Sequence, residues 1–208
     1  MIARSQDEGK TWRQPKPITD FSLDDSPGTL FVCPDETILC FINVQASWYG
    51  FSQAPETFKN DLEGLNTRQC IIRSTDNGET WSQPIWFDSP GTFYQRSHAQ
   101  AIQLPDGGIL WPTYCADQGK KQLFGAVHRS DDLGLTWRTI STIHRPEQDV
   151  DEPTVACFKD ELLVMVSRPD GGIFLSNDDG ASWNGSGKIV ESSVLKAPRL
   201  VVLPDQTL

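Results

Sequence analysis

The chain has 208 residues, of which 38% are hydrophobic and 22% charged, and its formal net charge is −10 at pH 7. This length suits one large all-β domain or two small ones. The negative charge argues against nucleic acid or an anionic membrane as the main partner, because the field of the protein would repel both. No segment is apolar over the roughly 18 residues that a membrane-spanning helix needs. The first residues also lack the apolar stretch of a signal peptide, so the sequence does not indicate a cell compartment.

The first recognisable element, Ser-Gln-Asp-Glu-Gly-Lys-Thr-Trp at 5–12, follows the pattern S-x-D-x-G-x-[ST]-W, which returns at 74–81, 130–137 and 176–183. The aspartate can accept hydrogen bonds from backbone N–H groups of its own turn, and the glycine can adopt a positive φ. Each copy, called an Asp box below, is therefore predicted to be a tight hairpin whose aspartate is structural and not catalytic.

Each Asp box ends in a tryptophan, which gives the next strand a large apolar anchor. All four are predicted to be buried in or between sheets, and replacing Trp137 by alanine is expected to cost roughly 3–5 kcal/mol of stability. The four are Trp12, Trp81, Trp137 and Trp183.

A second element alternates with the Asp boxes: an apolar strand, a short turn that in most copies contains Pro-Asp, and another apolar strand. Together the two elements give a unit of four antiparallel strands, which is the composition of a β-propeller blade. In chain order these strand pairs occupy 30–39, 102–110, 155–163 and 201–208.

These units predict an all-β fold, a β-propeller of four-stranded antiparallel blades in a single domain over residues 1–208. Met1 lies directly before an Asp box and Leu208 lies within a strand pair, so we expect three complete blades and two partial ones. An open arc of blades would expose apolar sheet faces. The domain is therefore expected to be incomplete at both ends, as a piece of a longer gene; the alternative is that a separate molecule completes the ring.

Five cysteines are scattered along the chain, without a CxxC pair or a Cys/His cluster of zinc-binding spacing. We therefore predict mostly buried thiols in strands, and we expect neither a metal nor a cofactor. The cysteines are Cys33, Cys40, Cys70, Cys115 and Cys157.

The Asp boxes and Pro-Asp turns resemble the BNR repeats of sialidases (neuraminidases), whose complete propellers have six blades. Asp boxes alone are not specific, because xyloglucan hydrolases and sortilin-type receptors also contain them. The more specific stretch runs from 151 to 168, where Glu152 opens a strand and Arg168 closes the next strand. It resembles the sialidase blade that carries a catalytic glutamate and an arginine, although Glu161 stands where that family usually has glycine.

The resemblance implies a retaining exo-α-sialidase acting on terminal acidic sugars of glycans. Such enzymes use three arginines on the substrate carboxylate, a tyrosine nucleophile assisted by a glutamate, and an aspartate as acid/base. Glu152 matches the assisting glutamate and Arg168 the second arginine, and a guanidinium suits a carboxylate because it can bind both oxygens. From the residues alone, Glu152 could equally be a surface acid and Arg168 half of an ion pair at a strand end.

The other catalytic groups that the resemblance implies are expected before Met1 and after Leu208. The chain by itself is therefore not expected to hydrolyse sialosides, and a non-catalytic Asp-box propeller that binds glycan or protein remains the alternative. Relatives of this kind are commonly exported, so an extracellular or periplasmic location is expected if a longer gene supplies a signal peptide.

Three further residues are candidates for substrate binding. His98 and Gln100 occupy positions on an inner strand equivalent to those of Glu152 and Thr154, and Arg199 lies on another inner strand. His98 could bind a sugar hydroxyl, but it could equally be a structural histidine.

The spacing also predicts where Glu152 and Arg168 lie. Each is eight residues from Asp160 in the intervening turn, and residues equidistant from a hairpin turn lie side by side on adjacent strands. We therefore expect the two side chains to be neighbours at the end of the blade opposite the Asp box.

Overall fold

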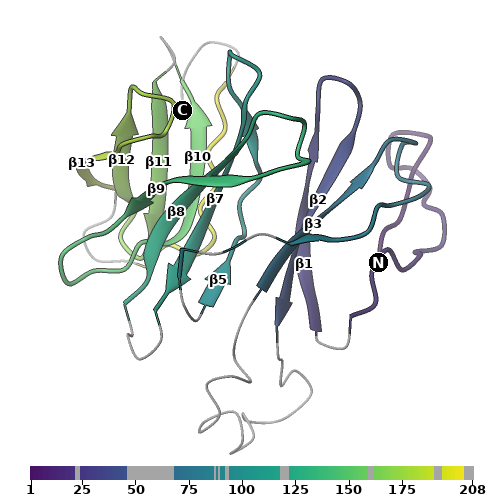
Figure 1. Cartoon of the computed structure of the whole chain (residues 1–208), viewed down its shortest axis with the longest axis horizontal. Coiled ribbons are helices and arrows are strands. Elements are labelled where there is room, and N and C mark those ends of the chain that lie inside the picture. Colours follow the sequence, from purple (N-terminus) through teal and green to yellow (C-terminus); the bar gives the residue numbers. More distant parts are fainter. Residues whose placement is uncertain are drawn as a thin grey trace, which may run out of the picture.

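The computed structural model describes residues 1–21, 24–45, 68–86, 88, 90–91, 94–117, 122–158, 162–189 and 194–203. Within these residues thirteen strands form three antiparallel sheets, and no segment is helical (Figure 1). The predicted all-β fold is therefore confirmed. No helix in the described part of the chain is long and apolar enough to cross a membrane.

The first and third sheets have four strands each, arranged in sequence order. The first contains β1 (Asp24–Val32), β2 (Ile38–Gln45), β3 (Arg68–Ser74) and β4 (Ile85–Trp86). The third contains β10 (Asp151–Cys157), β11 (Leu163–Arg168), β12 (Gly172–Ser176) and β13 (Asn184–Lys188).

The second sheet differs because its first strand is divided into two short pieces. Both pieces, β5 and β6, pair with β7, which pairs in turn with β8. The strands are β5 (Tyr94–Arg96), β6 (Ile102–Gln103), β7 (Ile109–Ala116), β8 (Phe124–Ser130) and β9 (Arg138–Ile143).

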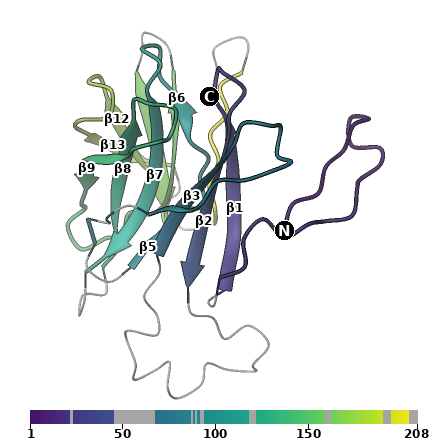
Figure 2. The same ribbon diagram turned by 45° about the vertical axis from the view of Figure 1, so that its right-hand side comes forward.

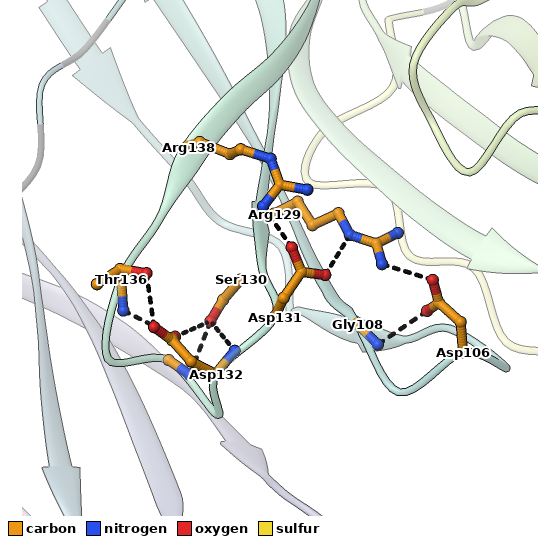
Figure 3. Close-up of polar contacts among 9 residues, drawn as sticks. Asp106, Gly108, Arg129, Ser130, Asp131, Asp132, Thr136 and Arg138 are labelled. Atoms are coloured by element: carbon orange, nitrogen blue, oxygen red, sulfur yellow. Dashed lines mark hydrogen bonds and ion pairs between the residues drawn. The ribbon is translucent and has the colours of Figure 1, made fainter.

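The Asp boxes form the hairpins that their sequence predicts, as Figure 3 shows for the third copy. The hydroxyl of Thr136 and its backbone N–H both donate to the carboxylate of Asp132, at 2.6 and 2.8 Å. Ser130 Oγ donates to the same carboxylate at 2.9 Å and accepts from the N–H of Gly134 at 2.8 Å. Gly134 has φ +81°, in the left-handed region that favours glycine. All of these polar groups lie within one turn, so the hairpin is specified locally.

The same contacts recur in the second Asp box and affect the ionisation of its aspartate. The side chain and backbone N–H of Thr80, together with Ser74, hydrogen-bond to Asp76 and lower the pKa of its carboxyl group to about 2. Hydrogen bonds to a carboxylate favour its charged form. An aspartate held in this way is a structural acceptor.

We predict that replacing Asp132 by alanine lowers the free energy of unfolding by about 1–2 kcal/mol, because the change leaves the donors of the turn without their charged acceptor. Urea denaturation of the two proteins measures the difference. Asp131, the neighbouring residue, provides the control, because its partly exposed carboxylate pairs with the side chains of Arg129 and Arg138, and Asp131→Ala should change stability less. Equal stability of Asp132→Ala and the parent chain would contradict the structural role.

Apolar side chains join each sheet to the next. One cluster combines Phe41 of β2 and Ile71 of β3 with Trp111 of β7, and Trp137 packs against it. A second cluster joins the second and third sheets and is partly covered by Trp183. A Cβ atom on Gly134 would lie 2.7 Å from Leu39 Cδ1, so the third Asp box itself contacts the first sheet.

The prediction that all four box tryptophans are buried is wrong for the first of them. Trp81, Trp137 and Trp183 are partly buried against the core, whereas 64% of Trp12 is exposed. Figure 2 shows the reason: the N-terminal loop that carries Trp12 extends away from the sheets.

Polar contacts also cross the sheet junctions. Asn43 Nδ2 donates to the carbonyl of Ser97 at 3.0 Å, which links the first and second sheets. Arg145 binds both carboxylate oxygens of Asp170, at 2.7 and 3.0 Å, and links the second and third sheets. These contacts fix the relative positions of the sheets that carry the candidate site.

The prediction of mostly buried thiols is confirmed. Cys157 is partly buried, and the other four are buried. Burial raises the pKa of the Cys40 thiol to about 11. In the described part of the chain, no group of three or more His, Cys, Asp or Glu residues could hold a metal ion.

Candidate functional site

Glu152 and Arg168 lie together at one end of the third sheet. Arg168 ends β11 opposite the start of β10, whereas the fourth Asp box begins at Ser176, which pairs with Leu163 at the other end of β11. The two candidate residues are therefore at the end of the sheet opposite the Asp box.

The predicted register is off by one residue at this end. From Thr154 onward the strands pair as expected, with Thr154 opposite Val166, but a bulge between Asp151 and Thr154 places Asp151 opposite Arg168. The bulge adds one residue to β10, which equal spacing from the turn cannot reveal. The turn residues Asp160 and Glu161 lie outside the described residues.

Glu152 occupies the bulge in an unusual backbone conformation. Its φ is +45°, in the left-handed region that residues other than glycine rarely adopt. Such a conformation costs of order 1–3 kcal/mol and persists where the surrounding contacts impose it. The bulge turns the Glu152 side chain toward neighbours from two other parts of the chain.

The carboxylate of Glu152 joins three segments. Its Oε1 lies 3.2 Å from Nη1 of Arg168 and 3.6 Å from Nδ1 of His98, which lies between β5 and β6. Its Oε2 accepts a hydrogen bond of 2.6 Å from the backbone N–H of Ala197. The second sheet, the third sheet and the segment 194–203 thus meet at this one side chain.

Arg168 contacts both acids of the bulge through the same nitrogen. Nη1 lies 3.1 Å from Oδ2 of Asp151 as well as 3.2 Å from Oε1 of Glu152. Nε of Arg168 is buried and has no hydrogen-bond partner among the described residues. The guanidinium is therefore held at one nitrogen and keeps an unsatisfied donor at another.

Glu152, Arg168, Asp151 and His98 are called the charged cluster below. Burial changes the pKa of two of its members, Asp151 and His98. It raises the pKa of Asp151 to about 6, although the charge of Arg168 opposes the change. Burial also lowers the pKa of His98; the positive charge of Arg96 acts in the same direction, and the negative charge of Glu152 opposes it.

The remaining predicted residues do not lie on the inner strands that the sequence predicts: His98 and Gln100 lie between β5 and β6, and Arg199 lies in the segment 194–203, outside any strand. Nε2 of His98 is 3.5 Å from the hydroxyl of Tyr114, a buried residue of β7. Arg199 is exposed, and its charge acts on His98. Gln100 is exposed two residues beyond His98, and none of the contacts described above involves it.

Two residues in or next to the charged cluster were not predicted. Asp151 directly precedes Glu152, and only the bulge brings both carboxylates to Arg168. Arg96, at the end of β5, affects His98 through its charge. Its position two residues before His98 was the available signal, because residues i and i+2 of an extended segment share a face.

Comparison with known proteins identifies relatives of this chain. The family model described as "BNR repeat-like domain" matches residues 1–208. A sialidase of Bacteroides fragilis is 25% identical over 97% of this chain, and the chain spans only 40% of that relative's length. A solved Dyadobacter fermentans protein of unknown function has a TM-score of 0.77 and 22% identity, covering 98% of this chain and 61% of that one.

The structure of Trypanosoma rangeli sialidase is also similar, with a TM-score of 0.63 and 20% identity, covering 88% of this chain and 32% of that one. Identities at this level show the fold alone, here the propeller fold of sialidases. Because the family model matches residues 1–208 of this chain, the chain belongs to the family of BNR repeat-like domains, and it is sialidase-like in sequence and fold.

Proposed function

We propose that this chain forms part of the active site of a retaining exo-α-sialidase that removes terminal acidic sugars from glycans. The observation that carries the proposal is the pairing of Arg168 with Glu152 at one end of the third sheet, where Arg168 keeps a buried, unsatisfied Nε. Trypanosoma rangeli sialidase, which has a similar fold, has been solved in complex with 2,3-difluorosialic acid as a covalent intermediate.

In this proposal Arg168 binds the carboxylate of the sugar. A guanidinium can donate to both oxygens of a carboxylate, and its charge compensates that of the ligand. Arg96 and Arg199, whose charges act on His98, add positive charge near the same place. An anionic sugar would thus find local positive charge on a protein whose net charge is −10.

Glu152 would act as the base that assists a tyrosine nucleophile, as in the sialidase mechanism. A neutral phenol suits this reaction because, unlike a carboxylate nucleophile, it is not repelled by the charged substrate. The tyrosine, the acid/base aspartate and two further arginines would come from other parts of a complete propeller. The contribution of this chain is therefore proposed to be one arginine and the assisting glutamate.

We predict that Arg168→Ala weakens binding of N-acetylneuraminic acid at least about tenfold, or about 1.4 kcal/mol, because a charged contact to the ligand carboxylate is lost. Isothermal titration calorimetry on the 208-residue chain measures the change, and in a complete propeller kcat/KM for a sialoside should fall by a similar factor. Arg138→Ala is the control, because this exposed arginine lies next to an Asp box and pairs with Asp131. Unchanged affinity in Arg168→Ala would overturn the proposal.

A non-catalytic binding module is the second candidate. It is favoured by one observation: both carboxylates, Asp151 and Glu152, already pair with Arg168, so these residues also have a structural role that requires no catalysis. A fluorogenic sialoside separates the two functions. Hydrolysis by a complete propeller containing this chain, lost in Glu152→Gln, supports the enzyme, whereas sugar binding without hydrolysis supports the module.

A further inference from the structure

The formal charges of Asp151, Glu152 and Arg168 do not cancel. Two carboxylates, Asp151 and Glu152, lie within 3.1 and 3.2 Å of one guanidinium nitrogen, so their formal charges and that of Arg168 sum to −1. An acidic sugar that approaches Arg168 would meet this negative charge as well. Like charges gathered at one guanidinium repel one another where water is partly excluded.

We propose that Asp151 is a positioning residue that couples the binding of an acidic sugar at Arg168 to the uptake of one proton. This inference rests on the proposed function. The proton comes from solvent, binds the Asp151 carboxylate as the sugar enters, and returns to solvent when the sugar leaves. Protonated Asp151 still holds the guanidinium as a neutral acceptor, and Arg168 then offers more of its charge to the ligand.

The surroundings of Asp151 suit this role. The charged groups that act on it are Arg168 of β11, Glu152 beside it, and Asp149 in the connection before β10. Only 14% of its side chain is exposed, and burial raises its pKa to about 6, so a proton binds near neutral pH. A second anion at Arg168 would favour that proton further.

Glu152 has contacts on both of its carboxylate oxygens. Its Oε2 accepts the 2.6 Å hydrogen bond from the N–H of Ala197, and its Oε1 lies 3.6 Å from His98. His98 is in turn acted on by Arg96, Arg168 and Arg199. The Glu152 carboxylate is thus held on both oxygens by groups from other segments of the chain.

The test is calorimetric titration of the 208-residue chain with N-acetylneuraminic acid at pH 5–8, in buffers of different ionisation enthalpy. The parent chain should take up about one proton on binding at pH 7.5, and its affinity should fall as pH rises. Asp151→Asn, which mimics the protonated acid, should bind without proton uptake and about tenfold more tightly at pH 7.5, because ionised Asp151 at pH 7.5 would otherwise disfavour the ligand. The methyl ester of the sugar, which is uncharged, should bind without proton uptake in both.

Asp131→Asn is the matched control, because it alters another Asp–Arg pair at an Asp box and should leave proton uptake unchanged. If the parent chain binds the sugar without proton uptake, the coupling is wrong and the proposed function stands. If it binds no acidic sugar at any pH, both proposals are wrong. Proton uptake by the parent chain is measured without any substitution, so the test holds even where Asp151→Asn does not fold. Unaltered proton uptake in a folded Asp151→Asn variant would assign the proton to another group and overturn the inference.

Discussion

Replacing Trp137 by alanine is expected to lower the free energy of unfolding by about 3 kcal/mol, at the lower end of the range for large buried aromatics because the ring is only partly buried. The ring lies at the junction of the first two sheets. Its centroid is 5.6 Å from that of Phe41 and 6.1 Å from that of Trp111, both in edge-on arrangements. Its removal would therefore open a cavity between two sheets.

The repeat supplies its own control for this experiment. Trp12 stands at the same position of the first Asp box and donates to Gly9 as Trp137 donates to Gly134, but 64% of Trp12 is exposed. Urea denaturation should show a loss of less than about 1 kcal/mol for Trp12→Ala, within the range of surface substitutions. Similar losses in the two variants would show that the indole acts within its own turn and does not join the sheets.

The second large effect is expected from acidification. His128 is fully buried and sits among polar partners: Thr113 Oγ1 lies 2.8 Å from its Nε2 and Thr139 Oγ1 lies 3.1 Å from its Nδ1. Burial lowers the pKa of His128 to about 3. A charged ring at this buried position would lack the hydration that it has in the unfolded chain, so protonation of the folded chain is disfavoured.

The direction in which pH changes stability follows from the protonation of His128 in the unfolded and in the folded chain. In the unfolded chain His128 takes up a proton near its ordinary pKa of about 6.5, while in the folded chain it stays neutral. Its contribution to stability is therefore complete above pH 6.5 and is lost as pH falls from there toward about 3. The expected loss is up to about 1.4 kcal/mol per pH unit.

Urea denaturation of the parent chain and of His128→Gln between pH 7.5 and pH 4.5 measures this contribution as the difference between the two slopes. Comparing the two slopes isolates the contribution of His128, because other groups also titrate in this pH range. Asp151, whose pKa is raised to about 6, contributes stability at low pH that is lost as pH rises through 6. His98, whose pKa is lowered, acts in the same direction as His128. Parallel slopes in the two proteins would show that His128 is protonated in the folded chain.

The sequence by itself determined the local structure of this protein. The serine, aspartate, glycine and threonine or second serine of each Asp box bond to one another within eight residues, as Ser130 and Asp132 do, so the pattern specifies the hairpin wherever it occurs. The alternation of boxes with apolar strand pairs then led to antiparallel sheets and to the sialidase-like family. The placement of Glu152 near Arg168 also followed from spacing, because hairpin register is a local property.

Only the tertiary structure decided which residues meet across these local units. The bulge in β10 put Asp151 opposite Arg168, and Glu152 reaches His98 and Ala197 from distant parts of the chain. The exposure of Trp12 depends likewise on the position of its loop, which extends away from the described sheets, and its own eight-residue motif does not encode that position (Figure 2). The hydrogen bonds of an Asp box form within one turn and need no other part of the chain. Bulges, burial and the charge around a side chain depend on the segments that pack beside them.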